Sequence, residues 1–265
     1  FDLDIDHNQF KNIFYTGLGY SVSISNACRH IRITNNSFTI RGRHYISMGA
    51  GTGTYCSGGW PGYIYISGNY FESCEQEAIN THPPFSKYGP LVVTGNTFVD
   101  CITGVESSNA TLVFCDNVTT NCTYGIRYFV DAAQTRYLLA TGNTFTMTKT
   151  DFSSNGGIRI EGSNANIVGN TFVNSHVVGA NGISNVHITG NHFNGKFTLH
   201  PAIIAVYATK NLKIVDNIFD LAIVKTHPGD GDYADFSENL TISGNTFRAN
   251  TLNSIQVLPS TKNVS

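Results

Sequence analysis

Three charged residues recur at matching places in a repeated pattern of a small residue, an aliphatic residue and then a polar one. Glu106 follows Gly-Val, Arg127 and Arg159 each follow Gly-Ile, and Glu161 stands two residues after Arg159. A carboxylate beside a guanidinium stays ionised and can act as a general base or nucleophile, and an arginine fork fits a substrate carboxylate. These residues therefore predict acid–base chemistry on an anionic or heavily hydroxylated ligand.

The same residues allow a second interpretation, in which they satisfy one another as an ion-pair ladder on the surface of a repetitive fold. Ser47 and Asn80 hold the equivalent place in earlier repeats, and the column would read Ser47, Asn80, Glu106, Arg127 and Arg159. Both interpretations require positions far apart in the chain to become neighbours. The elements that position them decide whether this is so.

An Asn-x-Phe pair recurs along the chain at nearly regular spacing. In one repeat Asn117 occupies the asparagine position, and Thr119 occupies the position where the phenylalanine is expected. A repeat of this period indicates a stacked array rather than a chain folded around one centre. The complete pairs are Asn8/Phe10, Asn36/Phe38, Asn69/Phe71, Asn96/Phe98, Asn143/Phe145, Asn170/Phe172, Asn191/Phe193, Asn217/Phe219 and Asn245/Phe247.

Each repeat divides into three short segments in which apolar and polar residues alternate, as in 63–67, 70–74 and 78–81. This period of two is typical of strands with one buried face, and no segment has the 3.6-residue apolar stripe of a helix. Strands this short are expected to pair with their equivalents one repeat away, about 4.8 Å distant, and so to wind parallel sheets into a solenoid.

The repeated residues are expected to be structural. The phenylalanines should point inward and stack, and the asparagines should form a hydrogen-bonded ladder at a corner whose left-handed backbone asparagine tolerates. Cys74, Cys101 and Cys122 each follow their Asn by five residues, so we expect them to pack inward as free thiols.

Composition narrows the function classes. The 265 residues include 41% hydrophobic and only 13% charged residues, and the net charge is −2. This excludes the basic footprint of a nucleic-acid-binding protein, and no apolar stretch is long enough to span a membrane. The repeat runs without a linker, so residues 1–265 are expected to form one domain, cut from a longer chain.

The motif Val/Ile-x-Ile-x-Gly-Asn-x-Phe, seen in residues 91–98 and 240–247, resembles the right-handed parallel β-helix of the pectate-lyase-like superfamily. The resemblance implies a right-handed single-stranded parallel β-helix of about ten rungs. It also implies a substrate groove along the sheet formed by the third strand of each rung, which would carry the Glu106 column.

Three long segments follow that third strand, at residues 48–62, 82–90 and 128–137. We expect them to leave from one edge and to wall the groove with aromatic rings, on which the apolar face of a sugar can stack. Asp131 lies in the third segment. The aromatic residues assigned to substrate binding are Trp60, Tyr55, Tyr88 and Phe85, and Asn80 is assigned with them.

Two short fragments add candidates at the same edge. Arg43 and His44 precede one groove strand, and His82 follows another in Thr-His-Pro, a pairing that resembles β-helix proteins of phage tails. His82 is a candidate general acid or base, although anchoring of its loop is an equal alternative and Thr-His-Pro recurs at 226–228. Arg43 and His44 are assigned to substrate binding.

The sequence contains only weak motifs for a bound metal or other cofactor. Asp230, Asp232 and Asp235 share one loop, and oxygen-rich loops of this kind can bind Ca²⁺. Their spacing matches no EF-hand, so a solvated acidic loop is the favoured interpretation and no metal is expected.

The leading hypothesis is a tailspike-like depolymerase, extracellular or on a virion surface, that cleaves a bacterial surface polysaccharide. In a lyase, Arg127 or Arg159 would neutralise a uronate while a base such as His82 removes a proton. In a hydrolase, Glu106 would pair with Glu161 or Asp131. The alternatives are a non-catalytic receptor-binding or fibre module and a polyuronate C5-epimerase. Related tail proteins are trimers, which makes a homotrimer one expectation.

Overall fold

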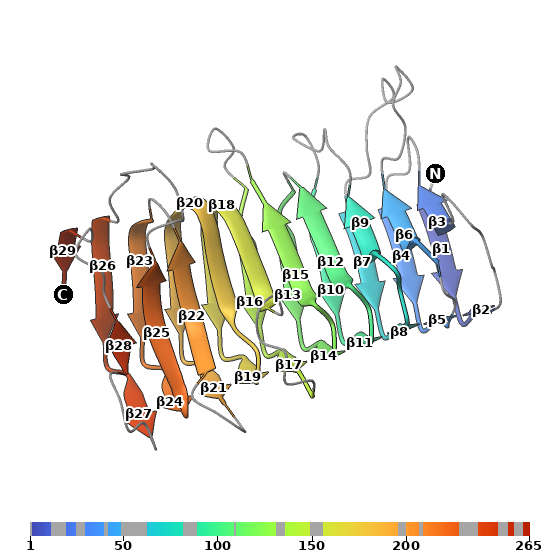
Figure 1. Cartoon of the computed structure of the whole chain (residues 1–265). Coiled ribbons are helices and arrows are strands. Elements are labelled where there is room, and N and C mark those ends of the chain that lie inside the picture. Colours follow the sequence, from blue (N-terminus) through green and yellow to red (C-terminus); the bar gives the residue numbers. More distant parts are fainter. Residues whose placement is uncertain are drawn as a thin grey trace.

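The computed structural model describes residues 2–11, 20–24, 30–39, 42–48, 63–81, 89–108, 110–130, 136–148, 156–195, 200–206, 209–227, 238–248, 254–256 and 262–265. These residues contain 29 strands and no helix. The strands pair in parallel, each with its equivalent in the next turn of chain, which confirms the parallel β-helix. Figure 1 shows the turns in sequence order from one end of the stack to the other.

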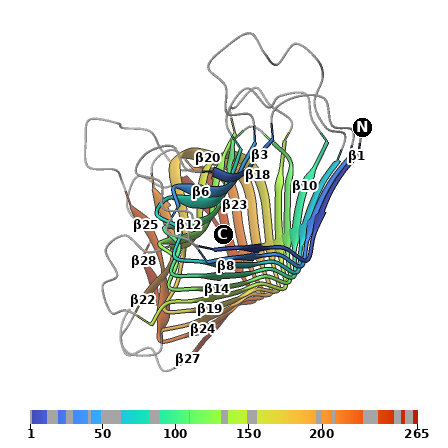
Figure 2. The ribbon, with the colours of Figure 1, turned by 90° about the vertical axis from the view of Figure 1, so that its right-hand side faces the viewer.

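Each rung contributes one strand to each of three faces, which Figure 2 shows along the stack. Face A precedes the Asn corner and contains β1 (Asp2–Asp6), β4 (His30–Thr34), β7 (Tyr63–Ser67), β10 (Leu91–Thr94), β13 (Leu112–Cys115), β16 (Leu138–Thr141), β23 (Lys210–Val215), β26 (Glu238–Ser243) and β29 (Lys262–Val264). The C-terminal parts of β18 (Gly156–Val168) and β20 (Val177–Thr189) complete it, because these long strands turn a corner from one face to the next.

Face B is the short sheet after the Asn corner, and its ten strands confirm the expected ten rungs. They are β2 (Gln9–Phe10), β5 (Ser37–Phe38), β8 (Tyr70–Glu72), β11 (Thr97–Val99), β14 (Val118–Thr120), β17 (Thr144–Thr146), β19 (Thr171–Val173), β21 (His192–Asn194), β24 (Ile218–Asp220) and β27 (Thr246–Arg248).

Face C carries the column of charged residues. It contains β3 (Tyr20–Ile24), β6 (His44–Met48), β9 (Glu77–Thr81), β12 (Thr103–Ser108), β15 (Tyr124–Phe129), β22 (His200–Val206), β25 (Ala222–His227), β28 (Ile255–Gln256) and the N-terminal parts of β18 and β20. In the described residues no helix is both long enough and apolar enough to cross a membrane.

The phenylalanines of face B stack through the core, as expected. Phe71 and Phe98, for example, have ring centroids 4.9 Å apart and planes within 9°. Thr119 breaks the column, and Phe114 of face A fills the gap with centroids 6.0 Å from Phe98 and 6.2 Å from Phe145. The core therefore keeps its continuous aromatic column by taking one ring from another face.

The asparagine ladder is also present. In rung after rung the backbone amide and the Nδ2 group of one asparagine donate to Oδ1 of the next, as from Asn96 to Asn117 at 2.9 and 3.1 Å. Nδ2 also donates to a carbonyl of the preceding rung, here that of Ile66. Each buried amide is thus bonded on both sides, which removes the cost of burying it.

The left-handed residue of this corner is not the asparagine, contrary to the expectation. It is the residue just before it, such as Gly68, Gly95 or Asp116, with φ between 54° and 64°. Glycine adopts this conformation without strain, and Asn and Asp tolerate it. In the recurring Gly-Asn dipeptide, the first residue therefore adopts the left-handed conformation of the turn, and the second hydrogen-bonds to the neighbouring rungs.

A second asparagine ladder lies at the corner between faces C and A in the C-terminal half. Asn185 donates to Asn164, Asn211 to Asn185, and Asn239 to Asn211, over 2.9–3.2 Å. All four have positive φ; Asn185, Asn211 and Asn239 are exposed, and Asn164 is half-buried. Cys74, Cys101 and Cys122 are free and buried, as expected.

Candidate functional site

The strand register confirms that the five residues of the column stack on one another, although Ser47 and Asn80 are buried. Ser47 pairs with Asn80, Asn80 with Glu106, Glu106 with Arg127, and Arg127 with Arg159. Residues separated by twenty or more positions therefore stand one above the next on face C.

Face C carries a second column, because two consecutive residues of each strand point inward. Gly104 and Val105 are an example, and a Cβ atom on Gly104 would lie 3.4 Å from the ring of Phe98. At Gly125 the Cβ would lie 2.5 Å from the ring of Phe145. The small residue thus makes room for the phenylalanine stack. The residues on either side of the inward pair both face outward.

The residues just before the small residue form this second column, which the sequence interpretation missed. Tyr20 pairs with His44, His44 with Glu77, Glu77 with Thr103, and Thr103 with Tyr124. The sequence does contain a pattern that indicates this second column, because Glu77 precedes Ala78 just as Thr103 precedes Gly104. Reading the strand as a strict alternation hid it.

The two columns meet in a network of charged side chains. His44 Nδ1 lies 2.8 Å from Glu77 Oε2, and Asn80 Nδ2 donates to the same oxygen at 3.1 Å. Arg127 Nη1 lies 2.8 Å from Glu106 Oε2 and 3.9 Å from Glu77 Oε1. Glu77 and Glu106 therefore lie on adjacent strands beside one guanidinium.

The environment moves the two carboxyl groups in opposite directions. Burial raises the pKa of Glu106, and the neighbouring Glu77 carboxylate and its hydrogen bond raise it further, against the opposing charge of Arg127. Burial also favours a higher pKa for Glu77, but hydrogen bonds with His44 and Asn80 outweigh it and leave that pKa lowered. Glu106 therefore binds a proton more readily than Glu77 does.

A second ion pair lies beside the first. Arg159 Nη2 contacts Glu161 Oε1 at 2.6 Å, and Arg159 Nη1 approaches the Tyr124 hydroxyl at 3.5 Å. The guanidinium of Arg127 lies 5.0 Å from the centre of the Phe129 ring, in cation–π range. Arg127 and Arg159, which the sequence predicts as ligands of a substrate carboxylate, are thus each already paired with a glutamate of the chain itself.

Several buried polar atoms at this site have no hydrogen-bond partner in the described part of the chain. They are Ser47 Oγ, Asn80 Oδ1, Thr103 Oγ1 and Arg127 Nε. Such groups are costly to leave unpaired, and a polar ligand is one way in which they are satisfied.

The other candidates are placed as follows. Arg43 Nε donates to Gln76 at 2.6 Å, and Glu161 pairs with Arg159 rather than with Glu106. His82, Asp131 and the aromatic residues Trp60, Tyr55, Tyr88 and Phe85 lie outside the described residues, as do Asp230, Asp232 and Asp235. Among the residues that are described, no group of three or more His, Cys, Asp or Glu side chains is arranged to hold a metal ion.

Comparison with known proteins returns no protein-family model, no curated protein and no solved structure that matches this chain. The fold defines the class, a parallel β-helix, and the function has to be argued from the residues of face C. Those residues combine two carboxyl groups whose pKa values are shifted in opposite directions, a histidine, an arginine and polar atoms without hydrogen-bond partners.

Proposed function

We propose that this chain is a glycan-active β-helix that hydrolyses a polysaccharide with Glu77 and Glu106, in the manner of the tailspike-like depolymerases of the pectate-lyase-like superfamily. The observation that carries the proposal is the contact between these two carboxyl groups, whose pKa values move apart. Paired titratable groups pushed in opposite directions are the usual mark of an acid and its partner base.

In the proposed reaction Glu106, whose pKa is raised, is the acid, and Glu77, whose pKa is lowered, is the nucleophile. Protonated Glu106 donates its proton to the glycosidic oxygen as the bond to the anomeric carbon breaks. Ionised Glu77 attacks that carbon and forms a glycosyl ester. Glu106, now ionised, then takes a proton from a water molecule that hydrolyses the ester and restores both groups.

The separation of the carboxyl groups favours this retaining route. Their oxygens lie 2.8 and 3.9 Å from the same arginine nitrogen. These two oxygens are therefore less than about 7 Å apart, which is short of most of the gap that an inverting enzyme needs for its water. His44 and Asn80 would hold the nucleophile in place.

The proposed substrate is rich in hydroxyl groups, as a bacterial surface polysaccharide outside the cell would be. Asn80 Oδ1 and the hydroxyls of Ser47 and Thr103 can exchange hydrogen bonds with sugar hydroxyls. A lyase that neutralises a uronate with a free arginine receives less support, because Arg127 and Arg159 are already paired with Glu106 and Glu161.

The test is turnover on a panel of surface polysaccharides with two readouts, new reducing ends and the ultraviolet absorbance of an unsaturated uronate. Hydrolysis gives the first without the second. Glu77→Gln and Glu106→Gln should each lower the rate about a thousandfold. Glu161→Gln, which removes a carboxylate of the same face that contacts Arg159, is the matched control and should change the rate little.

Absorbance of an unsaturated product, or full activity in both glutamine variants, would overturn the assignment. A second candidate, a non-catalytic receptor-binding module, is favoured by the same internal pairing of Arg127 and Arg159, which resembles a self-satisfied ion ladder. Glycan binding without either product, unchanged in Glu106→Gln, would select that candidate.

A further inference from the structure

Face A carries a continuous apolar patch on its outer side. It spans four consecutive rungs, from β7 to β16, and its central column, Tyr65, Val92, Val113 and Leu139, pairs in register on neighbouring strands. Tyr63, Tyr65 and Tyr137 are 59%, 40% and 44% exposed. Contiguous exposed apolar side chains mark interaction surfaces, and tyrosine is enriched in them. The patch consists of Tyr63, Tyr65, Val92, Val113, Tyr137 and Leu139.

The patch has an internal symmetry. Tyr63 and Tyr65 stand at one end on β7, and Tyr137 and Leu139 stand at the other end, at and just before β16. Val92 on β10 and Val113 on β13 fill the middle. A two-fold axis parallel to the strands, between β10 and β13, would therefore place Tyr63 over Tyr137, Tyr65 over Leu139 and Val92 over Val113.

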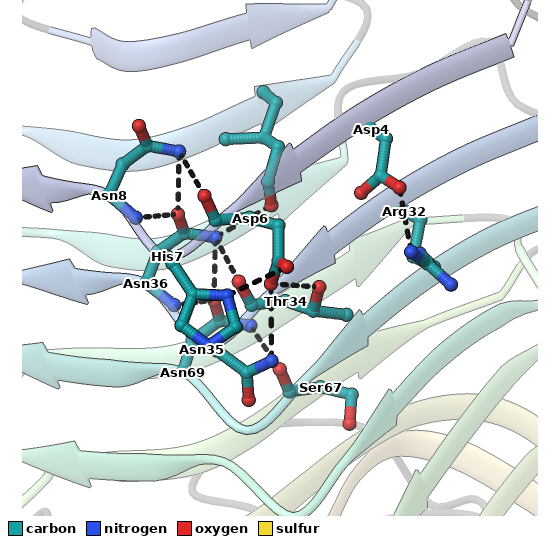
Figure 3. A network of polar contacts seen from close by, with 11 residues as sticks. Asp4, Asp6, His7, Asn8, Arg32, Thr34, Asn35, Asn36, Ser67 and Asn69 are labelled. Atoms are coloured by element: carbon teal, nitrogen blue, oxygen red, sulfur yellow. Dashed lines mark hydrogen bonds and ion pairs between the residues drawn. The ribbon is translucent and has the colours of Figure 1, made fainter.

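The N-terminal end of face A beyond the patch is acidic. Asp2, Asp4 and Asp6 lie outward on β1, and Arg32 contacts Asp4 at 2.7 Å (Figure 3). Hydrogen bonds with Thr34 and then His7 lower the pKa of Asp6 to about 2, so this carboxylate is charged throughout the usual pH range. Three carboxylates and one arginine lie at this end, with His30 beside Asp2 and His7 beside Asp6.

The opposite end carries one basic residue in the central column of the patch. His187 continues that column, and Lys213 follows it one rung later. The two-fold rotation would set Asp4 over His187, with Lys213 about 4.8 Å further along, and Arg32 over the uncharged Asn166. Asp4 of one copy would therefore lie near Lys213 of the other, and within these described columns no like charges would oppose each other.

A parallel association through the same face would do the reverse. An axis along the stack would place each rung beside its own copy, with Asp4 against the partner's Asp4 and Lys213 against the partner's Lys213. Like charges in an interface cost affinity, so the charges distinguish the two arrangements.

We propose that face A binds a second copy of this chain, antiparallel, around a two-fold axis between β10 and β13. An interface of this kind uses the same patch twice and closes on itself, as in most soluble dimers. It leaves Glu77 and Glu106 on face C uncovered. The proposal does not depend on the function proposed above.

Sedimentation velocity over a concentration series tests the association with the chain as it stands. The wild-type chain should form a dimer that weakens as salt rises, because salt screens the charged ends. Val113→Glu should weaken dimerisation about a hundredfold, because it buries an unpaired charge. The matched control is Val118→Glu, at a residue that is 42% exposed on face B, and it should leave the dimer intact.

A mixture of two single variants, Val92→Lys and Val113→Glu, tests the antiparallel register. In an antiparallel mixed dimer the introduced lysine of one copy faces the introduced glutamate of the other, so about tenfold of the lost affinity should return. In a parallel dimer each introduced charge would face a valine instead, and the mixture would associate no better than either variant alone. Circular dichroism and thermal melts establish that each variant is folded.

A wild-type chain that stays monomeric, or that forms a trimer, would overturn the proposal, as would a Val113→Glu variant that dimerises normally. A monomer whose glycan binding is lost in Tyr65→Ala would assign the patch to a sugar ligand and would also overturn it.

Discussion

Glu77 and Glu106 lie on adjacent strands beside the same arginine nitrogen, and their pKa values move in opposite directions. The difference has a local cause. His44 contacts Glu77 and Asn80 donates to it, and both stabilise its charge, whereas Glu106 is half-buried next to that charge and Arg127 and His44 offset the effect only in part. Of the two carboxyl groups, Glu106 therefore takes up a proton more readily.

The first prediction concerns stability against pH. A carboxyl group whose pKa is raised on folding stabilises the protein fully below its unfolded pKa, and that contribution is lost as pH rises through the folded pKa. In Glu106→Gln the side chain cannot ionise, so this loss of stability at higher pH does not occur. Its melting temperature should match that of the wild-type protein near pH 4 and exceed it by a few degrees near pH 8, as measured by calorimetry.

Glu77→Gln should behave in the opposite way. A lowered folded pKa stabilises the protein above the unfolded pKa, and the contribution is lost as pH falls through the folded pKa. This variant should therefore be less stable than the wild-type protein near pH 8 and approach it toward acid. If both variants changed stability with the same pH dependence, the opposed titration of the pair would be wrong.

A second prediction concerns His44, which is 1% exposed and contacts the Glu77 carboxylate at 2.8 Å. His44→Phe keeps a ring that can stack on Tyr20, 5.4 Å away, but removes the contact to Glu77. The pKa of Glu77 should rise. In a pH–rate profile of polysaccharide cleavage, the acidic limb should therefore move to higher pH while the alkaline limb, set by Glu106, moves little.

The matched control is His30→Phe on face A, where the histidine contacts Asp2 and lies beside the ring of Tyr63. This variant should leave both limbs in place. An unmoved acidic limb in His44→Phe would show that His44 does not position the charge of Glu77.

Much of this architecture could be predicted from the sequence, because a solenoid translates spacing along the chain directly into neighbourhood in space. Asn96 and Asn117 are 21 positions apart and hydrogen-bond to each other, and Glu106 and Arg127 have the same spacing and the same relation. The regular Asn-x-Phe repeat therefore predicts both the ladder and the column of face C.

The missing parts have local physical reasons. Glu77 was hidden because two successive residues, Ala78 and Ile79, point inward to accommodate the phenylalanine stack, so simple alternation fails at that place. The partners of the Arg127 and Arg159 side chains could not be predicted from the sequence either. A sequence shows that a guanidinium and a carboxylate share a face, but not whether they are paired with each other or with a ligand.

A third prediction concerns Phe114, which enters the stack at the rung where Thr119 replaces phenylalanine. Phe114→Ala should lower the free energy of unfolding by about 3–5 kcal/mol, since it leaves a cavity between Phe98 and Phe145. Thr119 pairs in register with both of those residues. Thr119→Phe should therefore recover part of the loss in the Phe114→Ala background.

In the wild-type background the same Thr119→Phe change should destabilise, because two rings would compete for one place. Urea denaturation of the four proteins measures the coupling between the two sites. Additive effects would mean that Phe114 does not substitute for the missing ring.

The last prediction separates backbone strain from crowding at the Asn corner. Gly68 and Gly95 occupy equivalent places on neighbouring rungs, with φ of 64° and 63°. A Cβ atom at Gly95 would meet nothing within 4 Å, whereas at Gly68 it would lie 2.6 Å from Asn35 Oδ1. Gly95→Ala should cost about 1 kcal/mol, from the left-handed conformation alone, and Gly68→Ala should cost more.

Gly95→Asn should be milder than Gly95→Ala, because asparagine tolerates this conformation and Asn35 occupies the same place in its own rung. Chemical denaturation of the three variants ranks them. A cost for Gly95→Ala near zero would mean that glycine is not needed for its backbone freedom. The Gly-Asn repeat would then owe its first residue to something other than the turn.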